Sequence, residues 1–97
     1  MAYLLGKLAA YQEGERTLLD NCGILWMSDI ATGGHSFTRM PYVLAGSAGG
    51  RLRTGRALKF MKASNCDPFV SLLNLFDVKA TAFGDPAYCN GPSPGLV

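Results

Sequence analysis

The sequence is poor in charge, has one histidine, and lacks any long apolar run. Only 16% of its 97 residues are charged, and a net charge of +2 is too small to indicate a nucleic-acid partner. No apolar run approaches the roughly 20 residues that cross a bilayer. Met1 leads directly into a helical pattern, without the charged region and cleavage site of a signal peptide. We therefore expect no nucleic-acid binding, no membrane span and no export signal in this polypeptide.

Cysteine is scarce as well. Cys22, Cys66 and Cys89 are an odd number and contain no CxxC pair, and a single histidine cannot complete a Cys/His zinc set alone. We expect no disulfide framework, although one bridge plus a free thiol fits the count. None of the three has a histidine near it in sequence, so they are weak candidates for a nucleophile.

Hydrophobic residues, in contrast, make up 48% of the chain, which is rich for a solvated monomer. The length fits one small domain, which we place at residues 1–86, followed by a Pro- and Gly-rich tail at residues 87–97. Some of the apolar surface is expected to meet a partner, either a second copy or a missing N-terminal region of a larger protein.

Two apolar runs and the polar loop between them form the centre of the pattern. The run Gly23–Met27 ends abruptly at Ser28-Asp29 and predicts a strand buried on both faces of a sheet. Pro41 opens a second run, Tyr42–Ala45, and the glycine-rich stretch Gly46–Gly50 predicts a turn. Polar groups at the end of a buried strand occupy the position where open α/β sheets bind ligands.

Two helices flank this centre. Apolar residues at helical spacing predict one over Ala2–Glu13, ended by Gly14, and another over Asp67–Phe76, with Asp67 as N-cap and Pro68 in the first turn. The apolar stripe of the second helix is expected to be core. Its members are Phe69, Leu72, Leu73 and Phe76, and Val70 and Leu75 widen it.

Further strands are expected in a hairpin that turns at Gly55, and a short extended run is expected over Val78–Phe83. The predicted fold is a small α/β domain with a mixed sheet of three to five strands covered by the two main helices.

The basic residues of the hairpin form a local cluster with only Phe60 as an interleaved aromatic. They are Arg51, Arg53, Arg56, Lys59 and Lys62. We expect a solvated face, with an anion site near Gly49-Gly50-Arg51 as the alternative.

The order of these motifs resembles an uncharacterised bacterial family of exported proteins of several hundred residues. The resemblance runs from Leu4 to Leu96 and rests chiefly on the string LAGSAGGRLRTGR, with TLLDN, GGHS, SLLNLF and FGD around it. It covers the C-terminal part of a full-length member and implies an exported or periplasmic protein. That family is distantly similar to the alkaline phosphatase and sulfatase superfamily, in which a core strand ends in Ser-Asp-His-Gly and the Asp and His bind metal.

The resemblance implies the C-terminal part of an alkaline-phosphatase-like fold. Ser28-Asp29 matches the Ser-Asp of the superfamily motif, but Ile30 stands where the histidine is expected, and His35 would have to replace it. The superfamily's nucleophile and its other metal ligands lie in earlier segments that have no counterpart here.

Two kinds of chemistry are open to the loop. Asp29 and His35 suit Zn, Mn or Fe, although catalytic metals usually have three protein ligands, and Asp20 or Asp85 would be needed to complete a set. Alternatively, Ser28 is a nucleophile with His35 as base and Asp29 or Asp20 orienting it. Ser36 is less suitable, because it is adjacent to the histidine. The alternative to both is that Asp29 caps a turn and His35 is solvated.

We therefore expect a hydrolase-like domain acting on a small ester, phosphoester or lactone, with or without a divalent metal, and derived or excised from an alkaline-phosphatase-like family. The alternative is a non-catalytic structural or interaction domain that self-associates or pairs with a missing upstream segment.

Overall fold

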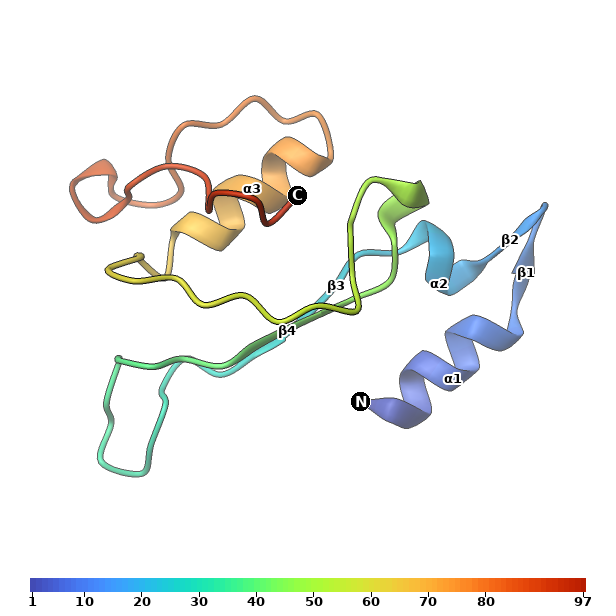
Figure 1. Cartoon of the computed structure of the whole chain (residues 1–97), viewed down its shortest axis with the longest axis horizontal. Helices are drawn as coiled ribbons and strands as arrows, with labels where there is room; N and C mark the ends of the chain where they lie inside the picture. Colours follow the sequence, from blue (N-terminus) through green and yellow to red (C-terminus); the bar gives the residue numbers. More distant parts are fainter. The chain divides into compact units, whose positions relative to one another are not determined.

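The computed structural model describes all 97 residues as a small α/β fold of three α-helices and two antiparallel sheets of two strands each (Figure 1). The chain divides into two compact units, Met1–Gly50 and Arg51–Val97. The α/β class is therefore confirmed, but the single mixed sheet of three to five strands is wrong, because each sheet stops at two strands. The arrangement of residues 1–86 as one domain stays a prediction.

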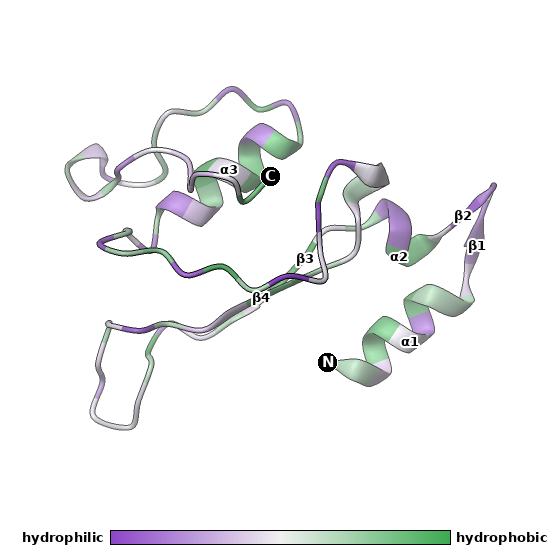
Figure 2. Cartoon of the chain, viewed as in Figure 1, coloured by the Kyte–Doolittle hydropathy of each residue, from purple (hydrophilic) through white to green (hydrophobic).

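The first unit begins with helix α1, Ala2–Ala10, which is largely hydrophobic (Figure 2) and has no buried residue. The helix is shorter than expected, because Gln12–Glu13 forms strand β1 and pairs with strand β2, Arg16–Thr17. Gly14 has a φ of 66° and is the first of the two residues that turn between these strands. A hairpin turn with glycine at that position needs the positive φ that glycine adopts without strain. The glycine therefore turns a hairpin instead of ending a helix.

Helix α2, Leu18–Asn21, is a single turn stabilised by a capping box. The Thr17 hydroxyl oxygen accepts from the Asp20 N–H at 3.2 Å, and the Thr17 N–H donates to the Asp20 carboxylate at 2.9 Å. Such reciprocal bonds satisfy backbone donors that have no partner inside the helix. The side chain of Asp20 is thereby committed to a local structural role.

Strands β3, Ile24–Met27, and β4, Tyr42–Ala45, form the second sheet, a ribbon in which Trp26 pairs with Val43. Both strands lie where the sequence predicts them. Burial on both faces is wrong, because none of the eight residues is buried and Trp26 is 60% exposed. The sheet has no third strand, so each strand has a neighbouring strand on one side only.

The turn after β4 is confirmed at Gly46–Gly50. Its last three residues, Ala48–Gly50, form a 3₁₀ turn. Gly46 has a φ of 86°, and a β-carbon there would lie 2.1 Å from the carbonyl oxygen of Cys22. No side chain fits in that space. The Ser47 hydroxyl donates to the carbonyl oxygen of Asp20 at 2.6 Å and joins this turn to α2.

The second unit is built on helix α3, Asp67–Leu75, close to its predicted bounds. Asp67 is not the N-cap, which is Cys66. The Asp67 carboxylate instead forms a hydrogen bond with Ser64, three residues earlier. The Ser64 N–H donates to the Asp67 carboxylate at 2.9 Å, and the Ser64 hydroxyl accepts from the Cys66 N–H at 3.2 Å. The chain therefore enters the helical turn before Asp67. Asp77, with a φ of 64°, follows the end of the helix, as expected from the sequence.

The predicted hairpin around Gly55 and the extended run Val78–Phe83 form no strands. Arg56 donates from Nε to the carbonyl oxygen of Arg53 at 2.9 Å, so this segment closes on itself. The amide of Asn74 bonds to both the N–H and the carbonyl of Ala80, at 2.9 and 3.1 Å. A side chain thus supplies the hydrogen bonds that a partner strand would have made.

The tail has no regular structure apart from a 3₁₀ turn, Pro86–Tyr88, but it packs on α3. The Ser93 N–H donates to the Ser71 hydroxyl at 2.8 Å, and both serines are buried. The buried apolar residues of this unit are Leu52, Val70 and Leu75. The core side of α3 is therefore the side that faces the tail.

Candidate functional site

The polar loop between β3 and β4 holds the three residues expected to carry chemistry. Ser28, Asp29 and His35 are all exposed, in a loop that begins directly after β3. Ile30 donates its N–H to the Ser28 hydroxyl at 3.4 Å, which is a local turn contact. Ser28 and Asp29 therefore directly follow a strand, as expected, and His35 lies further along the loop, although that strand is not buried.

Two backbone hydrogen bonds shape the loop around the histidine. Ala31 donates to the carbonyl oxygen of Ser36 at 2.7 Å, and His35 donates to that of Thr32 at 2.9 Å. His35 has a φ of 57°, a conformation that non-glycine residues adopt uncommonly and that histidine tolerates better than most. The loop thus has a defined backbone around the imidazole.

The side chains of this loop are not joined to one another by hydrogen bonds that involve the histidine. The Ser36 hydroxyl contacts the Thr38 hydroxyl at 3.0 Å, whereas no hydrogen bond links the His35 imidazole to Ser28 or Asp29. No group of three or more His, Cys, Asp or Glu side chains suited to a metal ion is found. No third ligand accompanies Asp29 and His35, and their metal binding and their catalytic roles stay predictions.

The two acids considered as additional ligands already have structural partners. Asp20 is held in the capping box, and the hydrogen bonds from Thr17 lower the pKa of its carboxyl. Asp85 accepts from the Ala87 N–H at 2.9 Å and caps the 3₁₀ turn that follows it. Each of them stabilises a local turn.

Asp67, in the second unit, was predicted only as a helix cap, but its carboxylate is buried and has several hydrogen-bond partners. Asp67 is only 4% exposed and accepts from the Asn90 N–H at 2.8 Å and the Asn90 side-chain amide at 3.1 Å, in addition to Ser64. Burial alone would raise the pKa of Asp67, but these hydrogen bonds outweigh it and the pKa is lowered. The Ser-x-x-Asp spacing is a sequence signal for the bond between Ser64 and Asp67, whereas no sequence signal indicates the contact of Asp67 with Asn90.

All three cysteines are free thiols and half-buried. The Cys89 thiol donates to the Asp67 carboxylate at 3.7 Å, so it belongs to the same network. The network therefore joins the start of α3 to the tail.

One ion pair lies in the second unit. Arg51 donates two parallel hydrogen bonds to the Asp77 carboxylate, at 2.8 and 3.0 Å. The hydrogen bond with Asp77 raises the pKa of Arg51, and the same bond lowers the pKa of Asp77. Both side chains are exposed, so the pair orients the chain near the end of α3 more than it stabilises the fold.

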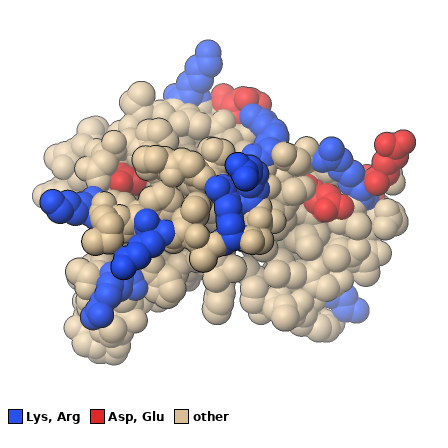
Figure 3. All heavy atoms as spheres, in the orientation of Figure 1, with Lys and Arg blue, Asp and Glu red and all other residues tan.

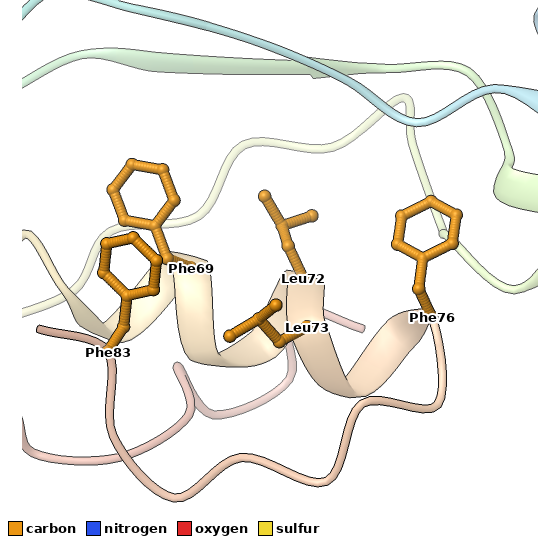
Figure 4. A pocket seen from close by; sticks show the side chains of 5 residues that line it. All are labelled: Phe69, Leu72, Leu73, Phe76 and Phe83. Atoms are coloured by element: carbon orange, nitrogen blue, oxygen red, sulfur yellow. The ribbon is translucent and has the colours of Figure 1, made fainter.

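An apolar groove of about 170 Å³ lies along α3 (Figure 4). Phe69 and Phe83 stack with ring centroids 4.8 Å apart, and Phe76 is 54% exposed. Leu72 and Leu73 complete the lining. The stripe expected to be core is thus only partly buried, because the tail covers the other side of the helix.

Comparison with known proteins adds no relative to these observations. No family model, no curated protein and no solved structure matches the chain. The structure contains no helix with the length and apolar character needed to cross a bilayer.

Proposed function

We propose that this chain is a structural or interaction domain whose β3–β4 ribbon is completed by a second copy of the same chain. The observation that carries the proposal is the composition of the ribbon, in which all eight residues are apolar and none is buried.

The two faces of the ribbon follow from its register. Side chains alternate along a strand, so Trp26 and Val43, which are cross-strand partners, project from the same face. They are the most exposed residues of the ribbon, at 60% and 41%. An isolated two-stranded ribbon is marginally stable in water, and a third strand or a covering layer is what normally stabilises it.

The size of the effect can be estimated for the tryptophan. An aromatic side chain buries roughly 200 Å², so covering the exposed 60% of Trp26 would remove roughly 120 Å² from water. That burial contributes about 3 kcal/mol per chain. Pairing of a strand of one copy with a strand of the other would add backbone hydrogen bonds between them.

The test is sedimentation equilibrium over a range of concentrations, on the native chain and on Trp26→Thr. We expect the native chain to form a dimer and the variant to dissociate at least tenfold more readily. Tyr88→Thr is the matched control, because Tyr88 is 73% exposed and lies outside the ribbon. A native chain that stays monomeric at every concentration would refute the proposal.

The second candidate is the hydrolase, supported by the exposed polar loop at the end of β3 and by the family resemblance. Asp29 and His35 would bind a divalent ion such as Zn²⁺, Mn²⁺ or Fe²⁺, and Ser28 would be the nucleophile in a metal-independent reaction. The substrate would be a small ester, phosphoester or lactone.

The hydrolase is tested by metal analysis and by turnover of nitrophenyl esters, nitrophenyl phosphates and lactones, with and without chelator. Asp29→Asn and His35→Ala should each abolish metal binding, and Ser28→Ala should abolish turnover that a chelator leaves unaffected. Unchanged metal content in both ligand variants would exclude the metal site. Absence of turnover on every substrate class would exclude the enzyme.

A further inference from the structure

The segment Arg51–Lys62 contains five cationic residues and no acidic residue. We infer that it forms a docking surface for anionic phospholipid headgroups at a membrane surface. This inference is independent of the ribbon and of the polar loop. It concerns contact with the surface of a bilayer and needs no spanning helix.

The segment is irregular but tied down at several points. Leu52 is 4% exposed, and Arg51 is paired with Asp77. Arg56 donates to the carbonyl oxygen of Leu96 at 2.8 Å, and the Asn90 side-chain amide donates to that of Lys62 at 3.4 Å. These contacts hold the backbone against its own unit, so the remaining side chains are presented outward.

Four of the five cations have no acidic partner, and three of these also make no side-chain hydrogen bond. Arg53, Lys59 and Lys62 are exposed and take part in no ion pair. Lys and Arg side chains project from the surface in the space-filling view (Figure 3). Anionic lipids attract such clusters, and each cation near the surface strengthens binding.

Apolar side chains lie between these cations. Leu58 is 44% exposed and Met61 is 76% exposed, on either side of Lys59 and Phe60. Aliphatic side chains beside cations can enter the boundary between headgroups and acyl chains, which adds apolar burial to the charge attraction. Single-stranded nucleic acid would instead need exposed aromatic rings for stacking, and Phe60, the one aromatic here, is half-buried. The combination favours a lipid surface over nucleic acid.

The test is co-sedimentation of the full chain with vesicles of phosphatidylcholine, alone or mixed with phosphatidylglycerol, at low and high salt. We expect binding only to the anionic vesicles, weakened by salt. Lys59→Gln combined with Lys62→Gln should reduce the affinity about 30-fold, the loss for two cations near an anionic surface. Met61→Ser should reduce it about tenfold by removing apolar burial.

The control is Lys7→Gln combined with Arg39→Gln, which removes the same charge from outside the segment and should leave binding unchanged. Circular dichroism establishes that each variant is folded. Equal loss in the control and the test variant would overturn the inference, since net charge alone would then explain binding. It would also be overturned by equal binding to both kinds of vesicle, by no binding to either, or by tighter binding to a single-stranded oligonucleotide that Met61→Ser leaves unaffected.

Discussion

Replacing Asp67 by asparagine tests whether the second unit is organised around a buried carboxylate. The side chain keeps its size, but an amide offers one acceptor oxygen and turns two donor hydrogens toward groups that are donors themselves. The Ser64 N–H and the Asn90 N–H and amide now donate to the carboxylate. At least one of these partly buried donors would lose its partner.

The magnitude follows from these contacts. A hydrogen bond to a charged group contributes about 1.5–3 kcal/mol, and leaving a buried partner unsatisfied costs about 1–3 kcal/mol. We therefore expect Asp67→Asn to destabilise the second unit by about 3 kcal/mol at neutral pH. The assay is amide hydrogen exchange of α3, which reports this unit even if the two units unfold separately.

The pH dependence gives a second readout. The folded-state pKa of Asp67 is lowered, so its stabilisation is complete above the unfolded value near 4 and is lost as the pH falls through the folded value. The native chain and the variant should therefore converge in exchange rate in acid. Asp29→Asn is the control, because Asp29 is exposed. A change in stability below about 0.5 kcal/mol for Asp67→Asn would refute the reasoning.

Three further predictions follow from single contacts. Gly46→Ala should destabilise the first unit by more than about 3 kcal/mol, because the new β-carbon would overlap the Cys22 carbonyl. Gly55→Ala is the control, since Gly55 has a similar φ and open space around it, and it should cost only about 1 kcal/mol. Equal loss of stability in denaturant titrations of the two variants would contradict this. Thr17→Ala should lower stability by about 1 kcal/mol, because it removes the N-cap side chain of α2. If amide hydrogen exchange in α2 is no faster in the variant, the capping box does not stabilise this helix. Ser71→Ala should cost about 2 kcal/mol by leaving the buried Ser93 N–H without an acceptor, and it should release the tail to proteolysis; a tail as resistant as the native one would show that this bond does not hold it.

The sequence predicted the elements whose signals are local. Pro41 and the apolar run after it indicated β4, and Pro68 with the helical stripe indicated α3; both elements are present. The turn at Gly46 was equally visible, because a glycine-rich stretch after a strand is a turn signal.

The errors come from contacts between distant residues. Alternating residues around Gly55 are compatible with a strand, but the backbone there is held by Arg56 and forms no ladder. The face of α3 that packs depends on where the tail returns, and the hydrogen bonds of the tail with Asp67 and Ser71 decide that. At the polar loop, the order of residues gave the position of His35 but not the turn around it.

The most direct test of the central claim uses Trp26, the only tryptophan in the chain. Its fluorescence and its quenching by acrylamide can be followed while the protein is diluted from high to low concentration. If two copies complete the ribbon, the indole is shielded from the quencher at high concentration and becomes accessible on dilution. Full accessibility at every concentration, with no spectral shift, would contradict the account.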